Sequence, residues 1–406
     1  MKPSLPRAIL CAVLWFALAM APALAAGPSF ELTVAAGGHD RANTPVVVLL
    51  PAAADANSVA LTDADGNRLD AQLTAPGLLR DSAAGQRELH FILPSLKKGR
   101  TLKLTAAIGG GGGDPGGETF AWQRVPGEYC ELSLGDRPVV RYICKTLTEE
   151  NREEAYKVFH HLYDPAGTRL VTKGSGGLYP HHRGLFFGYC NVGYGNGRKA
   201  DTWSGHNTPQ THGGVLAEEA GPVLGRHLLD VQWRGKDREV YLHEKRELCV
   251  YNTPGGRLIE FASRLVSAGG PIKLDGNAPH AGFHFRADQE VAAGTEKLTY
   301  YVRPDGKGEM GRARASAMDL PWDAISFVLG ETRYTLAYLD RPTNPKPVEY
   351  NERTYGRFGS FFKYELDDGK DLQVDYRVWL QDGEMTVEQV AALSADFVDP
   401  VQVTFR

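Results

Sequence analysis

The chain has 406 residues and a formal net charge of −4, with 45 Lys and Arg against 49 Asp and Glu. No basic stripe accompanies this balance, so the sequence predicts no nucleic-acid partner. Hydrophobic residues make up 42% of the chain, and 24 prolines interrupt its short apolar runs. This pattern favours a globular, strand-rich protein of one to three domains over a helical fold.

The first 25 residues have the pattern of a secretory signal peptide. Lys2 and Arg7 precede an apolar stretch at residues 8–20, and residues 23–25 read Ala-Leu-Ala, which fits an A-x-A cleavage site. We therefore expect cleavage near Ala26 and a periplasmic or secreted protein. No later apolar stretch reaches the length of a membrane-spanning helix, so we expect no membrane span.

Two domains are predicted after the signal peptide. Short apolar runs separated by turn sequences fill residues 26–108, a spacing typical of a small immunoglobulin-like β-sandwich. The glycine-rich segment 109–117 predicts a flexible linker. We assign residues 118–406 to a second, larger domain, and we expect the two parts to fold independently.

The second domain is expected to be a large antiparallel sandwich of two sheets, which makes the whole chain all-β. Hairpins are predicted at residues 129–145 and 240–266, and one short helix at residues 386–393. Cys130 and Cys144 flank the first hairpin turn. The sequence is consistent with a disulfide between them and equally with two free thiols. Glu244 and Arg246 share a strand face of the second hairpin, which we expect to be solvated.

Residues 179–189 combine histidines, an arginine and a dense apolar run. A buried strand of about five residues is predicted here, and if it begins at His181, then His181 and Arg183 share one face while His182 takes the other. Polar side chains at the mouth of a buried strand are typical of a rigid binding or catalytic site. The alternative is a turn in which backbone carbonyls satisfy both imidazoles.

Residues 280–287 alternate with a period of two. His280, His284 and Arg286 fall on one face of the predicted strand, and the apolar residues Ala281, Phe283, Phe285 and Ala287 fall on the other. Gly282 lies between the histidines and is expected to leave room for a ligand. The alternative is an exposed polar face on a half-solvated sheet.

Two further stretches supply candidate binding groups. Trp203 stands among small polar residues in a predicted loop, which is what a sugar-stacking wall requires. The sequence is equally consistent with a tryptophan that only covers the edge of a sheet. Residues 350–359 have no regular period, and we expect either a lid that brings Glu352 and Arg357 to the site or a solvated loop. The sequence contains no nucleophile elbow, phosphate-binding loop, dinucleotide fingerprint or H-E-x-x-H motif.

Four stretches of the chain resemble the bacterial PmoA-like family, often labelled "methane oxygenase PmoA". They are the run from His181 to Gly188, the Trp203 loop, the 233–248 hairpin, and the segment from the Asn-Pro loop at 341–345 through residues 355–356. The resemblance covers about residues 129–406. It implies a fold similar to the galactose-mutarotase-like β-supersandwiches, which act on or bind sugars through histidine and carboxylate groups.

These observations lead to one functional hypothesis with two rivals. The protein is expected to be a carbohydrate-active protein for a small sugar or oligosaccharide, in which His181, His182, His280 and His284 act as general acid or base. Arg183, Trp203, Arg286, Glu352 and Arg357 are the expected substrate-binding residues. No cofactor and no metal are predicted. The rivals are a non-catalytic glycan-binding protein and a metal-dependent enzyme with histidine ligands.

Overall fold

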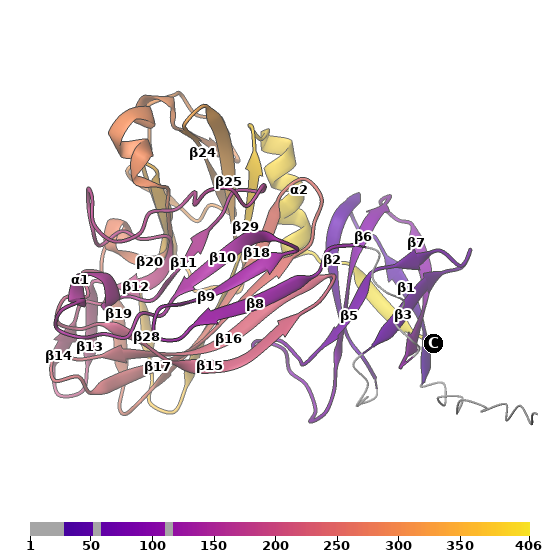
Figure 1. Ribbon diagram of the computed structural model, residues 1–406, viewed down its shortest axis with the longest axis horizontal. Helices are drawn as coiled ribbons and strands as arrows, with labels where there is room; N and C mark the ends of the chain where they lie inside the picture. Colours follow the sequence, from indigo (N-terminus) through magenta and orange to yellow (C-terminus); the bar gives the residue numbers. More distant parts are fainter. Residues whose placement is uncertain (1–27, 52–57, 110–116) are drawn as a thin grey trace, which may run out of the picture.

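The computed structural model describes residues 28–51, 58–109 and 117–406. The predicted signal peptide and most of the predicted glycine linker lie outside these ranges. Strands predominate, as expected for an all-β protein, and Figure 1 shows a small sandwich beside a larger body. Between residues 28 and 406, no described helix is long and apolar enough to cross a membrane.

The small sandwich consists of two antiparallel sheets that enclose a core including Leu32, Val46 and Phe91. Every second side chain of β1 faces this core, which is the alternation that a sheet with one buried face requires. One sheet has the order β30 (Gln402–Phe405), β1 (Ser29–Ala35), β7 (Thr101–Ile108), β3 (Val59–Asp63) and β4 (Arg68–Leu69); the other has β2 (Arg41–Leu49), β6 (Glu88–Leu96) and β5 (Ala71–Thr74).

The larger body contains two nine-stranded antiparallel sheets. The first, which we call the front sheet, has the order β23 (Ala317–Met318), β26 (Glu349–Arg353), β27 (Arg357–Phe361), β20 (Ala281–Arg286), β12 (Leu185–Tyr189), β11 (Phe159–Leu162), β10 (Arg137–Ile143), β9 (Tyr129–Leu134) and β8 (Phe120–Val125). The second, the back sheet, has the order β15 (Gln210–Ala220), β16 (Leu224–Arg234), β17 (Val240–Tyr251), β18 (Arg257–Ser267), β29 (Asp371–Asp382), β25 (Thr332–Asp340), β24 (Trp322–Leu329), β21 (Tyr300–Arg303) and β22 (Gly306–Lys307).

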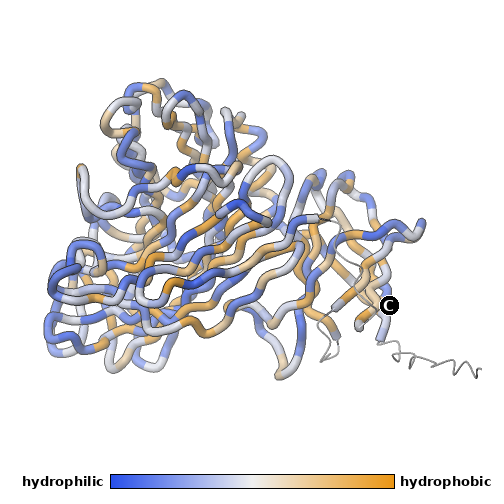
Figure 2. Tube along the Cα trace, in the orientation of Figure 1, coloured by the Kyte–Doolittle hydropathy of each residue, from blue (hydrophilic) through white to orange (hydrophobic). Residues whose placement is uncertain are grey.

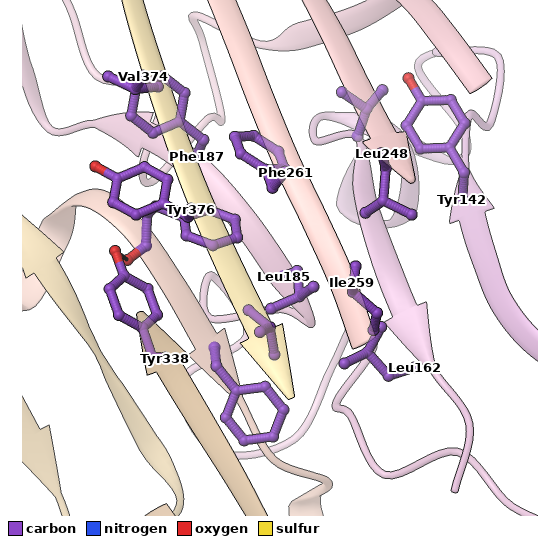
Figure 3. Close-up of a cluster of buried hydrophobic side chains, with 14 of the residues drawn as sticks. Tyr142, Leu162, Leu185, Phe187, Leu248, Ile259, Phe261, Tyr338, Val374 and Tyr376 are labelled. Atoms are coloured by element: carbon purple, nitrogen blue, oxygen red, sulfur yellow. Dashed lines mark hydrogen bonds between the residues drawn. The ribbon is translucent and has the colours of Figure 1, made fainter. Parts of the chain in front are cut away.

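Aromatic and aliphatic side chains fill the space between the front and back sheets (Figure 3). Phe283 of the front sheet stacks on Phe261 of the back sheet, with ring centroids 4.3 Å apart, and lies 4.9 Å from Tyr376. Burying each such ring contributes about 1.5–3 kcal/mol. The colours of Figure 2 alternate along many of these strands, as expected where one face is core and the other is not.

The remaining elements are short. A four-stranded sheet has the order β14 (Arg198–Ala200), β13 (Asn191–Tyr194), β19 (Ile272–Asp275) and β28 (Tyr364–Leu366). Helical turns occur at α1 (Arg152–Ala155), η1 (Ala278–His280), η2 (Val291–Thr295) and η3 (Glu296–Leu298). The helix α2 (Val387–Val398) begins at the predicted place, where Thr386 and Gln389 form a capping box, but it extends past residue 393.

One contact between the two bodies is made by α2, after which the chain returns to the small sandwich (Figure 1). Asp396 of α2 accepts hydrogen bonds from Arg41 at 2.9 Å and from Thr44 at 2.7 Å. Strand β30 then pairs with β1, with Phe405 opposite Leu32. The small sandwich therefore contains the C-terminal end of the chain as well as the described residues between 29 and 108.

Two local expectations need correction or completion. The pair Glu244 and Arg246 is not solvated: both side chains are fully buried, and their charged groups lie 2.8 Å apart. Glu244 also accepts hydrogen bonds from Trp233 and Ser263, which explains how a charge is tolerated there. Cys130 and Cys144 are both buried and free, so of the two alternatives left by the sequence the structure has two thiols and no disulfide between them.

Candidate functional site

Strand β20 divides its side chains between the core and the outer face of the front sheet. Phe283 and Phe285 point into the core, as the alternation predicts. His284 and Arg286 lie on the opposite face but are buried, with exposed fractions of 3% and 1%. Loops cover this face, so it is neither core nor the half-solvated surface that the alternative interpretation expected.

The turn before β12 brings His181 and His182 over this face. The strand begins at Leu185 and not at His181, because Tyr179 adopts a left-handed conformation with φ of 53° and its carbonyl accepts a hydrogen bond from the His182 amide at 3.0 Å. The two histidines therefore sit in a turn. His181 is half-buried and His182 is buried.

A buried lysine anchors this turn, and sequence reasoning missed it. The Lys157 ammonium donates a hydrogen bond of 2.6 Å to the His181 carbonyl oxygen and lies 4.2 Å from the centre of the Phe186 ring. Its side chain is fully buried. Burial, with Arg183 adding to the effect, holds the pKa of Lys157 well below its usual range.

Three imidazoles converge at the mouth of the site. The ring centroids of His181 and His182 are 4.3 Å apart, and that of His280 lies 5.5 Å from the first and 5.6 Å from the second. Each ring offers one nitrogen to a group in which all three lie within 4.8 Å of one another. His280 reaches this point from η1, directly before β20.

His284 stands behind these three rings and is fully hydrogen-bonded. Its Nε2–H donates to the Ala281 carbonyl at 2.7 Å, and its Nδ1 accepts from the Arg357 guanidinium at 3.2 Å. Both nitrogens are engaged, so His284 fixes the position of Arg357 and has no free nitrogen for a ligand. It was predicted as a catalytic residue, and its contacts are those of a positioning residue.

Close backbone approach, not ligand access, explains the glycines around His284. A side chain on Gly282 would come within 1.9 Å of the Ser360 carbonyl oxygen of β27. On Gly359 it would come within 2.5 Å of the His284 ring. The expectation that Gly282 leaves room for a ligand is therefore wrong, because the neighbouring strand takes that room.

Two tyrosines line the site, of which Tyr179 is exposed and Tyr355 is half-buried. Trp203 is 1% exposed and packs against Phe186, so it presents no open ring face to a sugar. Tyr179 is 42% exposed, and its ring centroid lies 5.0 Å from that of Tyr355 and 5.9 Å from that of His182. Both tyrosines stood in the stretches that the sequence singled out, but nothing there distinguished them from neighbouring aromatic residues.

The predicted arginines hold the loops around the histidines. Arg183 donates to the carbonyl oxygens of Pro180 and Glu154, each at 3.1 Å, and so ties down the turn. Arg286 donates to the Tyr355 carbonyl and lies 5.0 Å from the centre of that ring. In Arg286, Nε and Nη2 are buried without a hydrogen-bond partner in the described part of the chain.

Residues 350–359 form neither a lid nor a solvated loop. They make the hairpin of β26 and β27, in which Asn351 accepts a hydrogen bond from Arg357. Arg357 thus belongs to the site through His284. Glu352 is 1% exposed and pairs with Arg303, so its charge is neutralised away from the imidazoles.

The electrostatics of the site favour neutral imidazoles among cations. Burial, with Lys157 adding to the effect, lowers the pKa of His181 to about 4. Burial, with Arg357 adding to the effect, lowers the pKa of His182 and of His280, the latter opposed by Asp201. Burial also lowers the pKa of nearby Lys173 to about 8. Ring nitrogens are therefore available as acceptors at neutral pH.

The fold and the site together define an all-β protein with a histidine cluster on the outer face of one sheet of a large sandwich. By sequence, the chain belongs to a family of unknown function, DUF6807, whose model matches residues 129–395. This corrects the expected membership of the PmoA-like family, since the matching family is a different one. No curated protein matches the sequence.

Solved structures with similar folds share little sequence with the chain. An α-mannosidase from Enterococcus faecalis V583 is 8% identical to this chain, with a TM-score of 0.46. The match covers 93% of this chain and 46% of the mannosidase. A galactose mutarotase related enzyme from Lactobacillus acidophilus is 9% identical to this chain, with a TM-score of 0.31. That match covers 66% of this chain and 98% of the enzyme. The chain thus spans about half the length of the mannosidase.

Proposed function

We propose that this protein binds and acts on a sugar derivative that carries negative charge, at the cluster of His181, His182 and His280. The observation that carries the proposal is the convergence of three imidazoles beside an exposed tyrosine, Tyr179, and a half-buried one, Tyr355, with cationic side chains around them. This combination offers acceptors for hydroxyl groups, ring faces for the C–H groups of a pyranose, and positive charge for a carboxylate.

The division of roles follows from exposure and hydrogen bonding. His181 and His280 are half-buried and can reach a ligand, whereas Trp203 and His284 support the site from behind. A neutral imidazole at neutral pH can accept a proton from a substrate hydroxyl or carbon. An anionic substrate next to His181 would raise the pKa of this imidazole back toward neutrality, which strengthens it as a base.

Calorimetric titration of the full chain with uronic and neutral oligosaccharides tests the proposal. We expect uronic sugars to bind and neutral ones to bind at least tenfold more weakly, with both affinities reduced in His181→Ala. His243→Ala is the matched control, because His243 is exposed on β17 in the back sheet. Equal, weak binding of all sugars to wild type and His181→Ala would overturn the proposal.

The same titrations decide between an enzyme and a glycan-binding protein. We expect product to appear when a bound uronic oligosaccharide is incubated with wild-type protein and followed by mass spectrometry. Tight binding with unchanged sugar after prolonged incubation would select the glycan-binding alternative instead.

A further inference from the structure

The three clustered imidazoles also have the composition of a metal centre. One ring nitrogen each from His181, His182 and His280 lies within 4.8 Å of the other two. Around a tetrahedral zinc ion with bonds of about 2.0–2.1 Å, ligand nitrogens stand roughly 3.3–3.4 Å apart. Side-chain rotations that move each nitrogen by about 1 Å would close the triangle, because two of the three rings are half-buried and lie on turns.

The hydrogen bond of His280 presents one nitrogen to the cluster. Its Nδ1 lies 3.0 Å from the Asn277 amide oxygen, which can only accept, so Nδ1 carries the proton and Nε2 keeps its lone pair. The Asn277 amide nitrogen is directed toward the Cys190 sulfur, in agreement with this orientation. A hydrogen bond to the far nitrogen of a ligating histidine is the usual outer-shell arrangement of metal sites.

His182 provides a second, independent observation. Its side chain is 3% exposed, and its Nδ1 is buried without a hydrogen-bond partner among the described residues. A buried polar atom without a partner costs about 1–3 kcal/mol. In the neighbouring His284, which lies behind these rings, both nitrogens are bonded. The hydrogen bonds among the described residues therefore distinguish His284, which uses both ring nitrogens, from the three clustered histidines, each of which keeps a ring nitrogen available for a ligand.

We propose that His181, His182 and His280 bind a divalent transition-metal ion, with zinc as the reference ion and a fourth position open to an anionic ligand. An all-imidazole ligand set suits zinc, copper, nickel or iron, and it disfavours magnesium and calcium, which prefer oxygen. Three protein ligands with one open position are typical of catalytic zinc.

The surrounding charges indicate what completes the site. None of the three histidines forms an ion pair with a carboxylate in the described structure, while Arg357 approaches through His284 and Lys157 lies under the turn. These cations oppose a bare metal dication, and an anionic fourth ligand balances the charge. A hydroxide or a substrate carboxylate would serve. The metal site goes beyond the proposed sugar binding and does not depend on it, but an imidazole nitrogen that binds the metal cannot at the same time accept a proton from a substrate.

Metal titration of the full chain, purified without a histidine tag and freed of metal by a chelator, tests the proposal. We expect one equivalent of zinc to bind by calorimetry and one equivalent of cobalt to give the visible absorption of a tetrahedral complex. His280→Ala and His181→Ala should each weaken zinc binding at least 100-fold, while His243→Ala leaves it unchanged. Thermal unfolding of the metal-free variants verifies that they are folded.

Asn277 supplies the finer test. Asn277→Ala should weaken zinc binding about 10–100-fold, the usual effect of losing an outer-shell partner, and Asn277→Asp, which keeps the acceptor, should restore it. Absence of stoichiometric binding, or binding that His280→Ala and His181→Ala leave unchanged, would overturn the metal site. Sugar titrations repeated on the chelated protein separate the two proposals, since sugar binding that survives without metal supports the first alone.

Discussion

At the residue scale, the buried ring of His284 carries two hydrogen bonds that a smaller side chain would break. We expect His284→Ala to lower the free energy of unfolding by about 2–4 kcal/mol, because it leaves a cavity and removes a hydrogen-bond partner of Arg357. His280→Ala should cost below about 1 kcal/mol, since His280 is half-buried. Urea denaturation of both variants measures the difference; equal, small losses would show that His284 is solvated after all.

The structure brings His181, His182 and His280 close together, as the sequence led us to expect, but it holds Glu352 elsewhere, and the sequence did not indicate how deeply each side chain is buried. The period of two in residues 280–287 fixes the side of β20 on which His284 lies. Whether that side is open depends on the loops that fold over it, which carry Trp203 and the His181 turn. Lys157 could not be recognised, because its partner is the carbonyl of His181 and such contacts leave no local pattern.

At the element scale, β17 holds the buried pair of Glu244 and Arg246. Arg246→Leu would leave the Glu244 carboxylate buried without its cation, so we expect a loss of about 3–5 kcal/mol in the free energy of unfolding. Replacing both residues by leucine should recover part of that loss. Chemical denaturation of Arg246→Leu, Glu244→Leu and the double variant measures the coupling; additive losses would show that the pair contributes no joint stabilisation.

Hairpins were the elements that sequence predicted well, since β9–β10 and β17–β18 each combine alternation with a local turn. The hairpin of β26 and β27 was missed for a physical reason. Glu352 in it is neutralised by Arg303 from β21, and this partner lies too far along the chain for spacing to reveal. The charged residues of this stretch therefore led to the expectation of a lid or a solvated loop.

At the scale of the whole molecule, the C-terminal strand β30 closes the small sandwich. Deleting residues 402–406 removes the pairing with β1 and the contact between Phe405 and Phe30, whose ring centroids are 6.0 Å apart. We expect a loss of about 1–2 kcal/mol from that sandwich, which for a domain of this size is roughly 4–16 °C in Tm. Calorimetry of the truncated chain should show an earlier first transition; an unchanged scan would mean that β30 adds nothing.

The stability of the junction between the two bodies depends on pH through the protonation of Glu247. This carboxylate accepts a hydrogen bond from the Leu78 amide of the small sandwich at 3.1 Å and lies 3.8 Å from Arg226, in a cavity of about 410 Å³. Burial raises the pKa of Glu247 to about 7, above the usual value of about 4.3 for an unfolded chain.

A raised carboxyl pKa means that the folded state binds the proton more tightly than the unfolded state. The stabilisation that this proton provides is therefore full below about pH 4.3 and is lost as the pH rises through about 7. Glu88 in the same cavity has its pKa lowered to about 2, where burial is outweighed by its contacts with His90 and Arg226, so it titrates outside this window.

Glu247→Gln isolates this effect, because glutamine keeps the acceptor for Leu78 and cannot ionise. We expect the variant to match wild type closely in Tm at pH 4, where Glu247 is protonated in both states, and to be more stable than wild type at pH 8, where the wild-type carboxylate is charged. Thermal unfolding of both proteins at these two pH values provides the comparison. A variant less stable than wild type at pH 8 would show that the ionised Glu247 is stabilised by Arg226 and that the junction gains from the charge.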